Sequence, residues 1–252
     1  MTIAKVKIQK FLADCTVSSR RGAEELVRDG RVRVNGEVVN DPAIRVDPDE
    51  DVVEYDGRRI VPFGGLPRGL ILYKTAGVVT SVSDPHNEQT VYDLLPTRER
   101  GHRWIYVGRL DKDSEGLVLF TDSGELAHRL THPSFKVPKR YLVRVPGRVE
   151  TRHLRQFERG LTIDGRQMRM DSVRVVRWDG EATSLEVVLH QGEKRQIRRM
   201  LERLGYSVSA LCRTEFGTLS LEGLSPGGCR RLTAREMKLL SREAGQKNDN
   251  AG

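Results

Sequence analysis

The segment Gly108–Gly124 reads Gly-Arg-Leu-Asp-Lys-Asp-Ser-Glu-Gly-Leu-Val-Leu-Phe-Thr-Asp-Ser-Gly and joins a polar turn to an apolar run. Asp111 lies in the polar part, shortly before the β-type run Gly116–Thr121. Loops held by a rigid sheet often carry catalytic groups, so this carboxylate is a candidate catalytic residue. An aspartate in a loop, taken alone, is more often a turn or cap residue, so the rest of the chain must decide.

Strands and helices are expected on both sides of this segment. The expected strands are Leu70–Tyr73, Gly116–Thr121, Tyr141–Val145 and Leu185–Leu189. The expected helices are Gly124–Leu130, Glu150–Arg159, Gln196–Leu204 and Ala234–Arg242. This order of elements lacks regular strand–helix alternation. The sequence also lacks the glycine fingerprint of a nucleotide-binding doubly wound sheet. The pattern therefore predicts an α+β fold.

A strand with one aromatic side chain among basic residues follows the central segment. Lys139–Val145 reads Lys-Arg-Tyr-Leu-Val-Arg-Val, with Tyr141 in its first half. A tyrosine in a strand usually belongs to the core, but beside a basic groove its ring can stack on an extruded base. Such a groove is predicted from four arginines, namely Arg140, Arg144, Arg195 and Arg199.

The segment Gln191–Leu201 predicts an arginine-rich helix that begins near Arg195. Its buried stripe would comprise Ile197, Met200, Leu201 and Leu204. Arg198 lies at the edge of this stripe and can point inward. A buried guanidinium needs an anion, and Asp111 is the attractive candidate. Taken alone, a run of arginines is more often a solvated helix face.

Residues 1–62 form a segment of mixed charge with 11 basic and 12 acidic residues. Helical spacing from Val6 to Leu12 predicts one short helix, and Ser18-Ser19 can cap a second. Asn35-Gly36 predicts a tight hairpin turn. The acids concentrate in residues 46–62 and leave a separate basic surface that can grip RNA phosphates. The residues expected on this surface include Arg20, Arg21, Arg31, Arg33 and Asn35.

The composition favours a nucleic-acid partner. The net charge is +8, and 33 arginines outnumber 10 lysines, although genomic base composition also enriches arginine. No apolar run is long enough for a membrane span and the N-terminus does not read as a signal peptide, so a cytoplasmic protein is expected. Three widely spaced cysteines give no disulfide framework. Residues 63–69 are expected to be a linker between domains at 1–62 and 70–242, and 243–252 a disordered tail.

Two resemblances now combine these patterns. The stretch from Val6 to Ile60, with Ser19-Arg20-Arg21 and the hairpin, resembles the RNA-binding module of ribosomal small-subunit protein four. The other segments resemble the RsuA/RluB type of ribosomal pseudouridine synthase, whose members act on small-subunit or large-subunit RNA. The matching segments are Gly108–Gly124, Lys139–Val145, Arg195–Met200 and Gly227–Thr233. Together these resemblances cover residues 3 to 240.

The resemblance implies a catalytic domain with a mixed sheet that isomerises uridine without a cofactor. Asp111 would be the nucleophile, attacking either C6 of the uracil or C1′ of the ribose. Arg198 would pair with Asp111, Tyr141 would stack on the flipped uracil, and Arg109 would contact RNA beside it. Further RNA contacts are implied at Lys74, Lys139, Arg195, Arg199, Ser19, Arg20, Arg21, Arg31, Arg33 and Asn35.

The implied partner is ribosomal RNA or a pre-ribosomal particle, bound by a monomer. The chain ending and the N-terminal module are most similar to the large-subunit enzymes, which favours a uridine near the peptidyl-transferase region, with a small-subunit target left open. Two other classes of protein are alternatives. A non-catalytic ribosome-assembly factor would be favoured by loss of Asp111, Tyr141 or Arg198, and an RNA methyltransferase would need a glycine-rich loop after its first strand. A zinc site at His128, His132 and Glu125 is a minor alternative because Pro133 interrupts the helix.

Overall fold

The computed structural model describes residues 5–15, 17–18, 20–61, 67–86 and 88–245. The chain divides into two compact units, the first comprising Met1–Leu66 with Asp122–Gly124 and the second Pro67–Thr121 with Glu125–Gly252. Within the described ranges, no helix has the length and apolar character needed to cross a membrane.

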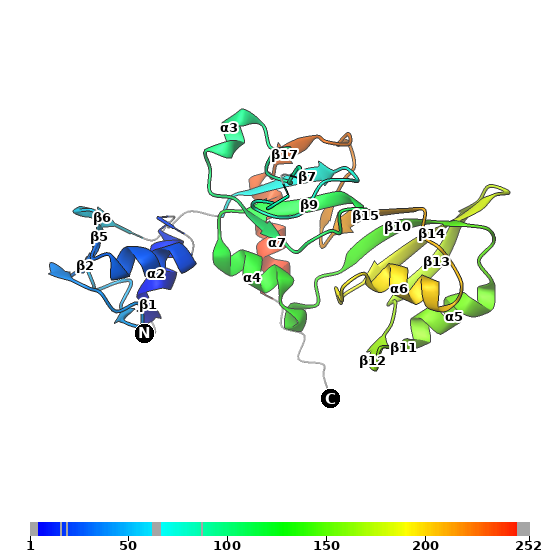
Figure 1. Cartoon of the computed structure of the whole chain (residues 1–252), viewed down its shortest axis with the longest axis horizontal. Coiled ribbons are helices and arrows are strands. Elements are labelled where there is room, and N and C mark those ends of the chain that lie inside the picture. The colour runs from blue at the N-terminus through cyan, green and yellow to red at the C-terminus, as the bar shows by residue number, and fades with distance from the viewer. Residues whose placement is uncertain (1–4, 16, 19, 62–66, 87, 246–252) are drawn as a thin grey trace. The chain divides into compact units, whose positions relative to one another are not determined.

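The first unit contains two short helices and two small antiparallel sheets (Figure 1). Its elements are β1 (Val6–Lys7), α1 (Ile8–Asp14), α2 (Arg20–Arg28), β2 (Val32–Val34), β3 (Glu37–Val38), β4 (Arg45–Val46), β5 (Val53–Tyr55) and β6 (Arg58–Ile60). The strand orders are β3-β2-β5-β6 and β1-β4. The predicted hairpin is confirmed: Asn35 and Gly36 have φ values of 52° and 85°, as a tight turn between β2 and β3 requires.

The second unit is built on one mixed sheet of nine strands, in the order β13-β14-β10-β15-β9-β7-β17 with β8 beside β9 and β16 beside β15. Its strands are β7 (Gly69–Lys74), β8 (Ile105–Val107), β9 (Glu115–Thr121), β10 (Lys139–Pro146), β13 (Ser172–Trp178), β14 (Ala182–Leu189), β15 (Ala210–Phe216), β16 (Leu219–Ser220) and β17 (Cys229–Arg231). A separate hairpin pairs β11 (Leu161–Ile163) with β12 (Arg166–Met168). Since β15 and β9 run parallel and the other pairs of this sheet antiparallel, the α+β prediction with a mixed sheet is confirmed.

Buried apolar side chains cover both faces of β9. The helices are α3 (Thr97–Arg100), α4 (Gly124–Thr131), α5 (Thr151–Arg159), α6 (Gln196–Arg203) and α7 (Ala234–Glu243), with a 3-10 turn at Pro133–Phe135. One core cluster contains Val118 and Phe120 of β9 together with side chains of α5 and α6. The other takes Leu117 and Leu119 together with side chains of α4 and α7. Burial on both faces explains why β9 is a continuous apolar run rather than an alternating one.

Parallel pairing brings β15 very close to the start of β9. Gly116 has a φ of 111°, and a Cβ atom there would lie 2.3 Å from the carbonyl oxygen of Arg213. Only glycine fits this position, because a side chain would need both a strained backbone and displacement of the neighbouring strand. This close approach fixes the strand that follows the polar turn of Asp111.

The eight elements predicted in this unit are present, with ends that differ by a few residues. Most of the missed strands are only two or three residues long. The two longer ones are β13, which is exposed along most of its length, and β15, whose buried positions include the charged Arg213 and so lack an apolar alternation. The predicted start of the C-terminal tail is too early. Helix α7 extends through Glu243, whose carboxylate accepts a hydrogen bond from the Thr218 amide at 3.1 Å, and Ala244 is fully buried. Residues 246–252 of that expected tail and most of the expected linker lie outside the described residues.

Candidate active site

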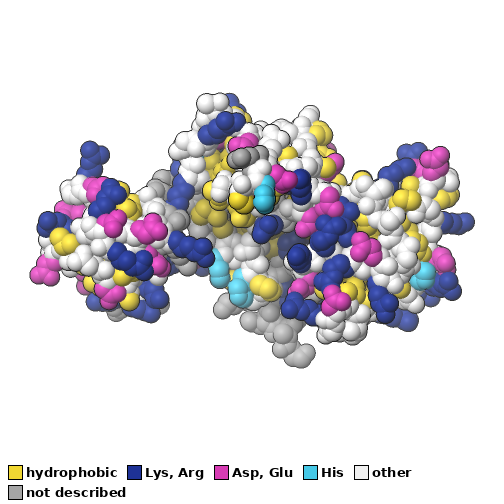
Figure 2. All heavy atoms as spheres, in the orientation of Figure 1, with side chains coloured by type: hydrophobic (Ala, Val, Ile, Leu, Met, Phe, Trp, Pro, Cys, Tyr) yellow, Lys and Arg dark blue, Asp and Glu magenta, His cyan; other side chains and the backbone are white. Residues whose placement is uncertain are grey.

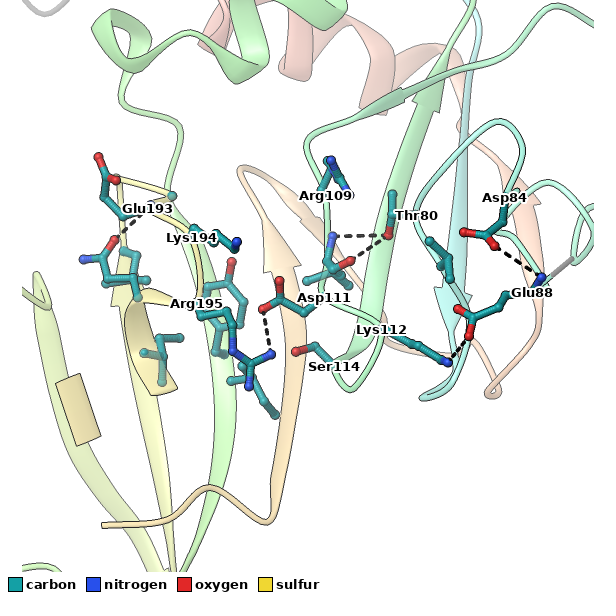
Figure 3. Close-up of a pocket in the computed structure, with 18 residues that line it drawn as sticks. Thr80, Asp84, Glu88, Arg109, Asp111, Lys112, Ser114, Glu193, Lys194 and Arg195 are labelled. Atoms are coloured by element: carbon teal, nitrogen blue, oxygen red, sulfur yellow. Dashed lines mark hydrogen bonds and ion pairs between the residues drawn. The ribbon is translucent and has the colours of Figure 1, made fainter. Parts of the chain in front are cut away.

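The second unit contains a pocket of about 790 Å³ at the polar end of β9 (Figure 3). Its lining combines apolar side chains and the ring of Tyr141 with eight charged side chains. The lining residues are Val79, Thr80, Asp84, Glu88, Arg109, Leu110, Asp111, Lys112, Ser114, Tyr141, Leu189, Gly192, Glu193, Lys194, Arg195, Gln196, Ile197 and Leu211. Apolar walls with a few convergent polar groups are typical of a binding site for a planar organic group.

The loop that carries Asp111 is held in place by the buried side chain of Lys74. This lysine is fully buried, and its Nζ donates hydrogen bonds to the carbonyl oxygens of Thr75 (3.1 Å), Lys112 (3.2 Å) and Ser114 (2.6 Å). Burial lowers the pKa of Lys74 to about 8. The expected RNA contact at Lys74 is therefore corrected: its ammonium faces inward because the turn carbonyls need a donor.

A second buried contact fixes the residue before Asp111. The Thr80 hydroxyl donates to the Leu110 carbonyl at 2.9 Å and accepts from the Leu110 amide at 3.3 Å. The Asp111 side chain itself keeps 36% of its surface exposed and lines the pocket. The backbone is thus anchored on both sides while the carboxylate stays accessible to a substrate.

The arginine beside Asp111 is Arg195 rather than the predicted Arg198. Arg195 Nη1 lies 3.9 Å from Asp111 Oδ2, and Figure 3 shows the two side chains pointing toward each other. Arg198 is 6% exposed, and it donates instead to the carbonyl oxygens of Asp113 (2.9 Å) and Val208 (3.2 Å). The inward direction predicted for Arg198 is confirmed, but its partner is the neighbouring acid of the same turn.

Asp113 is the residue that sequence reasoning missed. Its carboxylate accepts two hydrogen bonds from Arg195, each of 3.1 Å, and lies 3.3 Å from Arg198 Nε. Burial alone would raise the pKa of Asp113, but the Arg195 hydrogen bond and the two arginine charges outweigh it and lower the pKa. The only signal in the sequence was a second aspartate two residues after Asp111.

The backbone of Arg195 explains how it reaches this turn. Arg195 precedes α6 with φ 53° and ψ 31°, a left-handed conformation that is uncommon for a side chain other than glycine, asparagine or aspartate. A helical conformation at this residue would direct its side chain along α6. Such local strain is typical of functional positions, where the surrounding structure holds it in place.

Tyr141 lines the pocket from β10 and is 8% exposed. Side chains alternate along this strand, so Arg140 and Arg144 lie on the opposite face from Tyr141. Arg140 binds Glu186 (2.7 Å) and Glu215 (2.8 Å) there. The predicted groove that joins Arg140 and Arg144 to the arginines of α6 is therefore wrong, since strand alternation separates them.

Two more of the implied RNA contacts are engaged within the protein. Lys139 Nζ donates to the carbonyl oxygens of Val137 (3.0 Å) and His190 (3.1 Å), and burial lowers its pKa to about 8. Arg199 forms an ion pair with Asp164. Lys139 thus ties β10 to the loop after β14, which corrects its expected role. Arg109, in contrast, is exposed and lines the pocket, and its expected contact with RNA stays a prediction.

The rim of the pocket carries charges of both signs. Lys112 forms an ion pair with Glu88, and Arg166 lies 3.2 Å from Glu193. Figure 2 shows Lys and Arg side chains interspersed with Asp and Glu over the visible face of the second unit. On this face the basic side chains therefore do not form one uninterrupted basic field.

The sequence predicts that the acidic run of the first unit lies apart from the basic groups, and this prediction is wrong. Arg31 forms an ion pair with Asp56, and Asn35 Nδ2 donates to Asp51 at 2.9 Å. Arg33 Nη1 donates to the Gly36 carbonyl at 3.0 Å, and Arg21 is exposed. Asparagine-to-aspartate and arginine-to-aspartate contacts brace the hairpin. Ser19 and the side chain of Arg20 lie outside the described residues.

The minor zinc alternative gains no support from the geometry. The rings of His128 and His132 lie 5.2 Å apart, but Glu125 binds Arg129 at 2.5 Å. Among the residues that the structure describes, no three His, Cys, Asp or Glu side chains are placed to hold a metal ion.

Comparison with known proteins identifies the two units. The family model described as RNA pseudouridylate synthase matches residues 69–203, and the model of the S4 domain matches residues 6–52. The chain is 38% identical over 244 residues to an uncharacterized RNA pseudouridine synthase of Aquifex aeolicus, covering 96% of each chain. It is 34% identical to ribosomal large subunit pseudouridine synthase B of Bacillus subtilis, covering 93% of this chain and 95% of the relative.

A solved structure agrees with this. A crystal structure of a pseudouridylate synthase aligns with a TM-score of 0.64 and 28% identity, covering 93% of this chain and 99% of the other. The chain belongs to the RNA pseudouridylate synthase family, and it carries an S4 domain for RNA binding. It is an RNA pseudouridine synthase, an isomerase.

Proposed function

We propose that this enzyme converts a uridine of large-subunit ribosomal RNA to pseudouridine, with Asp111 as its nucleophile. The observation that carries the choice of target is similarity over almost the whole chain to relatives named ribosomal large subunit pseudouridine synthase B. These include the Bacillus subtilis protein and a Vibrio cholerae protein that is 39% identical over 93% of this chain and 74% of its own length.

The chemistry assigned to Asp111 follows from its placement. The carboxylate forms a bond to C6 of the uracil or to C1′ of the ribose, the N1–C1′ bond breaks, and the uracil turns within the pocket. A C5–C1′ bond then forms, the bond to Asp111 breaks, C5 loses its proton and N1 gains one. Arg195 Nη1, 3.9 Å from Asp111 Oδ2, attracts the carboxylate electrostatically.

The apolar part of the pocket accommodates the flipped base. The ring of Tyr141 offers a stacking surface beside Asp111, and its hydroxyl is our candidate for assisting removal of the C5 proton. Arg109, exposed at the rim, is placed to occupy the position that the base leaves in the RNA. Extruding a stacked uridine costs a few kcal/mol, which RNA binding must offset.

The target is tested by mapping pseudouridines in a strain that lacks the gene. Carbodiimide-dependent primer-extension stops across both ribosomal RNAs should lose one position in the large-subunit RNA, and the wild-type gene should restore it. Loss of a stop in the small-subunit RNA would contradict the proposed target, and an unchanged map of both RNAs would contradict ribosomal RNA as the substrate.

The S4 domain is expected to bind RNA largely through phosphates. We propose that residues 1–62 act as a tethered RNA module joined by residues 63–69 to the catalytic domain that begins at residue 70. Replacing exposed Arg21 with alanine should reduce the slope of log affinity against log salt by roughly 0.7–0.9, the value for one lost phosphate contact. Fluorescence anisotropy with a ribosomal RNA fragment between about 50 and 200 mM salt measures this slope.

The matched control for Arg21→Ala is Arg174→Ala in the second unit, where Arg174 is paired with Glu186 at 2.8 Å. The control should leave the slope unchanged. An unchanged slope for Arg21→Ala as well would show that Arg21 makes no phosphate contact.

A further inference from the structure

Two carboxylates and two guanidinium groups form one network beside the pocket. Arg195 lies between Asp111 and Asp113, and Arg198 lies beneath Asp113. Of these four residues, Asp111 and Arg195 line the pocket, whereas Asp113 does not. Any effect of Asp113 on the reaction is therefore exerted through Arg195 and Arg198, because its own side chain does not line the pocket.

The two carboxylates are not equal partners of Arg195. Asp113 receives both prongs of its guanidinium at 3.1 Å, whereas Asp111 lies at 3.9 Å, beyond hydrogen-bond distance. A bidentate arginine–carboxylate pair has the more specific and stronger geometry. Asp113 thus fixes the direction of Arg195 and leaves Asp111 with electrostatic attraction alone.

The difference between the Arg195–Asp113 and Arg195–Asp111 distances bears on the reactivity of Asp111 as a nucleophile. An attacking carboxylate must be ionised, and it must also have an oxygen lone pair free of strong hydrogen bonds. A guanidinium at 3.9 Å attracts the carboxylate without occupying its lone pair. A closed bidentate pair on Asp111 would have to be broken before each attack.

We propose that Asp113 is a positioning residue that holds Arg195 away from Asp111 and so keeps the carboxylate oxygens of the nucleophile free of a strong hydrogen bond. This proposal rests on Asp111 being the nucleophile. Asp113 also receives Arg198, which is otherwise bound only to carbonyl oxygens among the described residues. Without the Asp113 charge, the nearest carboxylate for Arg195 is Asp111.

The variant Asp113→Asn tests this with little change in shape, and the Arg198 bond to the Asp113 backbone is retained. In its crystal structure without RNA, Arg195 should close on Asp111 to a hydrogen-bond distance of roughly 2.7–2.9 Å. We expect kcat to fall about tenfold, which corresponds to about 1.4 kcal/mol, with KM for RNA little changed, because the closed Arg195–Asp111 pair must open before each attack. The acid limb of the kcat profile should move to lower pH, since a closer guanidinium favours the ionised form.

Asp164→Asn is the matched control, because Asp164 pairs with Arg199 of the same helix and is 84% exposed. Asp164 has a φ of 51°, a conformation that asparagine tolerates, so this variant should fold and keep wild-type kcat. If Arg195 stays in place in Asp113→Asn and kcat is that of wild type, the proposal is overturned.

A fall in kcat accompanied by a lower melting temperature, with no shift of the pH profile, would also overturn it, since Asp113 would then be merely structural. The crystallographic distance does not depend on which residue attacks. Failure of Asp111 as the nucleophile is therefore detected separately, by the activity of its own variants.

Discussion

Asp111→Asn is expected to abolish pseudouridine formation, with a loss of roughly 10⁴-fold or more in the single-turnover rate. The neutral amide has no ionised oxygen to form the bond to the substrate, and no other described carboxylate has its place between Arg195 and the apolar wall of the pocket. Release of tritium from RNA labelled at C5 of uridine measures the reaction directly, because C5 exchanges its proton for a carbon–carbon bond.

RNA binding by the same variant should stay within about twofold of wild type, since one side chain contributes little to a phosphate-dominated interface. Asp84→Asn, at the opposite rim of the pocket, is the control for removing a negative charge from this site. It should retain tritium release. Full release from Asp111→Asn would refute Asp111 as the nucleophile.

Lys74→Met is expected to lower the free energy of unfolding by about 3 kcal/mol, because methionine fills the space but leaves three turn carbonyls without their donor. Conversion should fall as well, since the Asp111 turn loses its anchor. Urea unfolding followed by circular dichroism measures the first effect. Lys136→Met, on an exposed lysine, is the control and should change the free energy by less than about 0.5 kcal/mol.

The pH dependence of the free energy of unfolding should also distinguish Lys74 from the exposed Lys136. Lys74 loses its proton near pH 8 in the folded protein and near 10.5 when unfolded, so the unfolded chain binds more protons between these values. The free energy of unfolding contributed by this group therefore rises with pH in that window. The difference between wild type and Lys74→Met should change between about pH 8 and 10.5 with this sign. A difference that is constant with pH would show that Lys74 keeps an ordinary pKa when folded.

The sequence alone was sufficient for the elements that carry the site. Apolar runs identified β9 and β10, helical spacing identified α6, and Asn35-Gly36 identified the hairpin. These patterns are local, because each depends on residues a few positions apart. The placement of Asp111 in an accessible turn followed in the same way, as did the inward direction of Arg198.

Only the tertiary structure decided which charges meet. Arg195 and Arg198 are three residues apart, and both reach the turn that holds Asp111 and Asp113. Arg195 has a left-handed backbone, and its guanidinium binds Asp113 and lies 3.9 Å from Asp111, whereas Arg198 is buried and binds Asp113. Lys74 likewise reads as a basic residue in the sequence and becomes an internal donor once β7 packs beside β9. Long side chains can satisfy several partners, so their pairing depends on distances between segments that no local pattern contains.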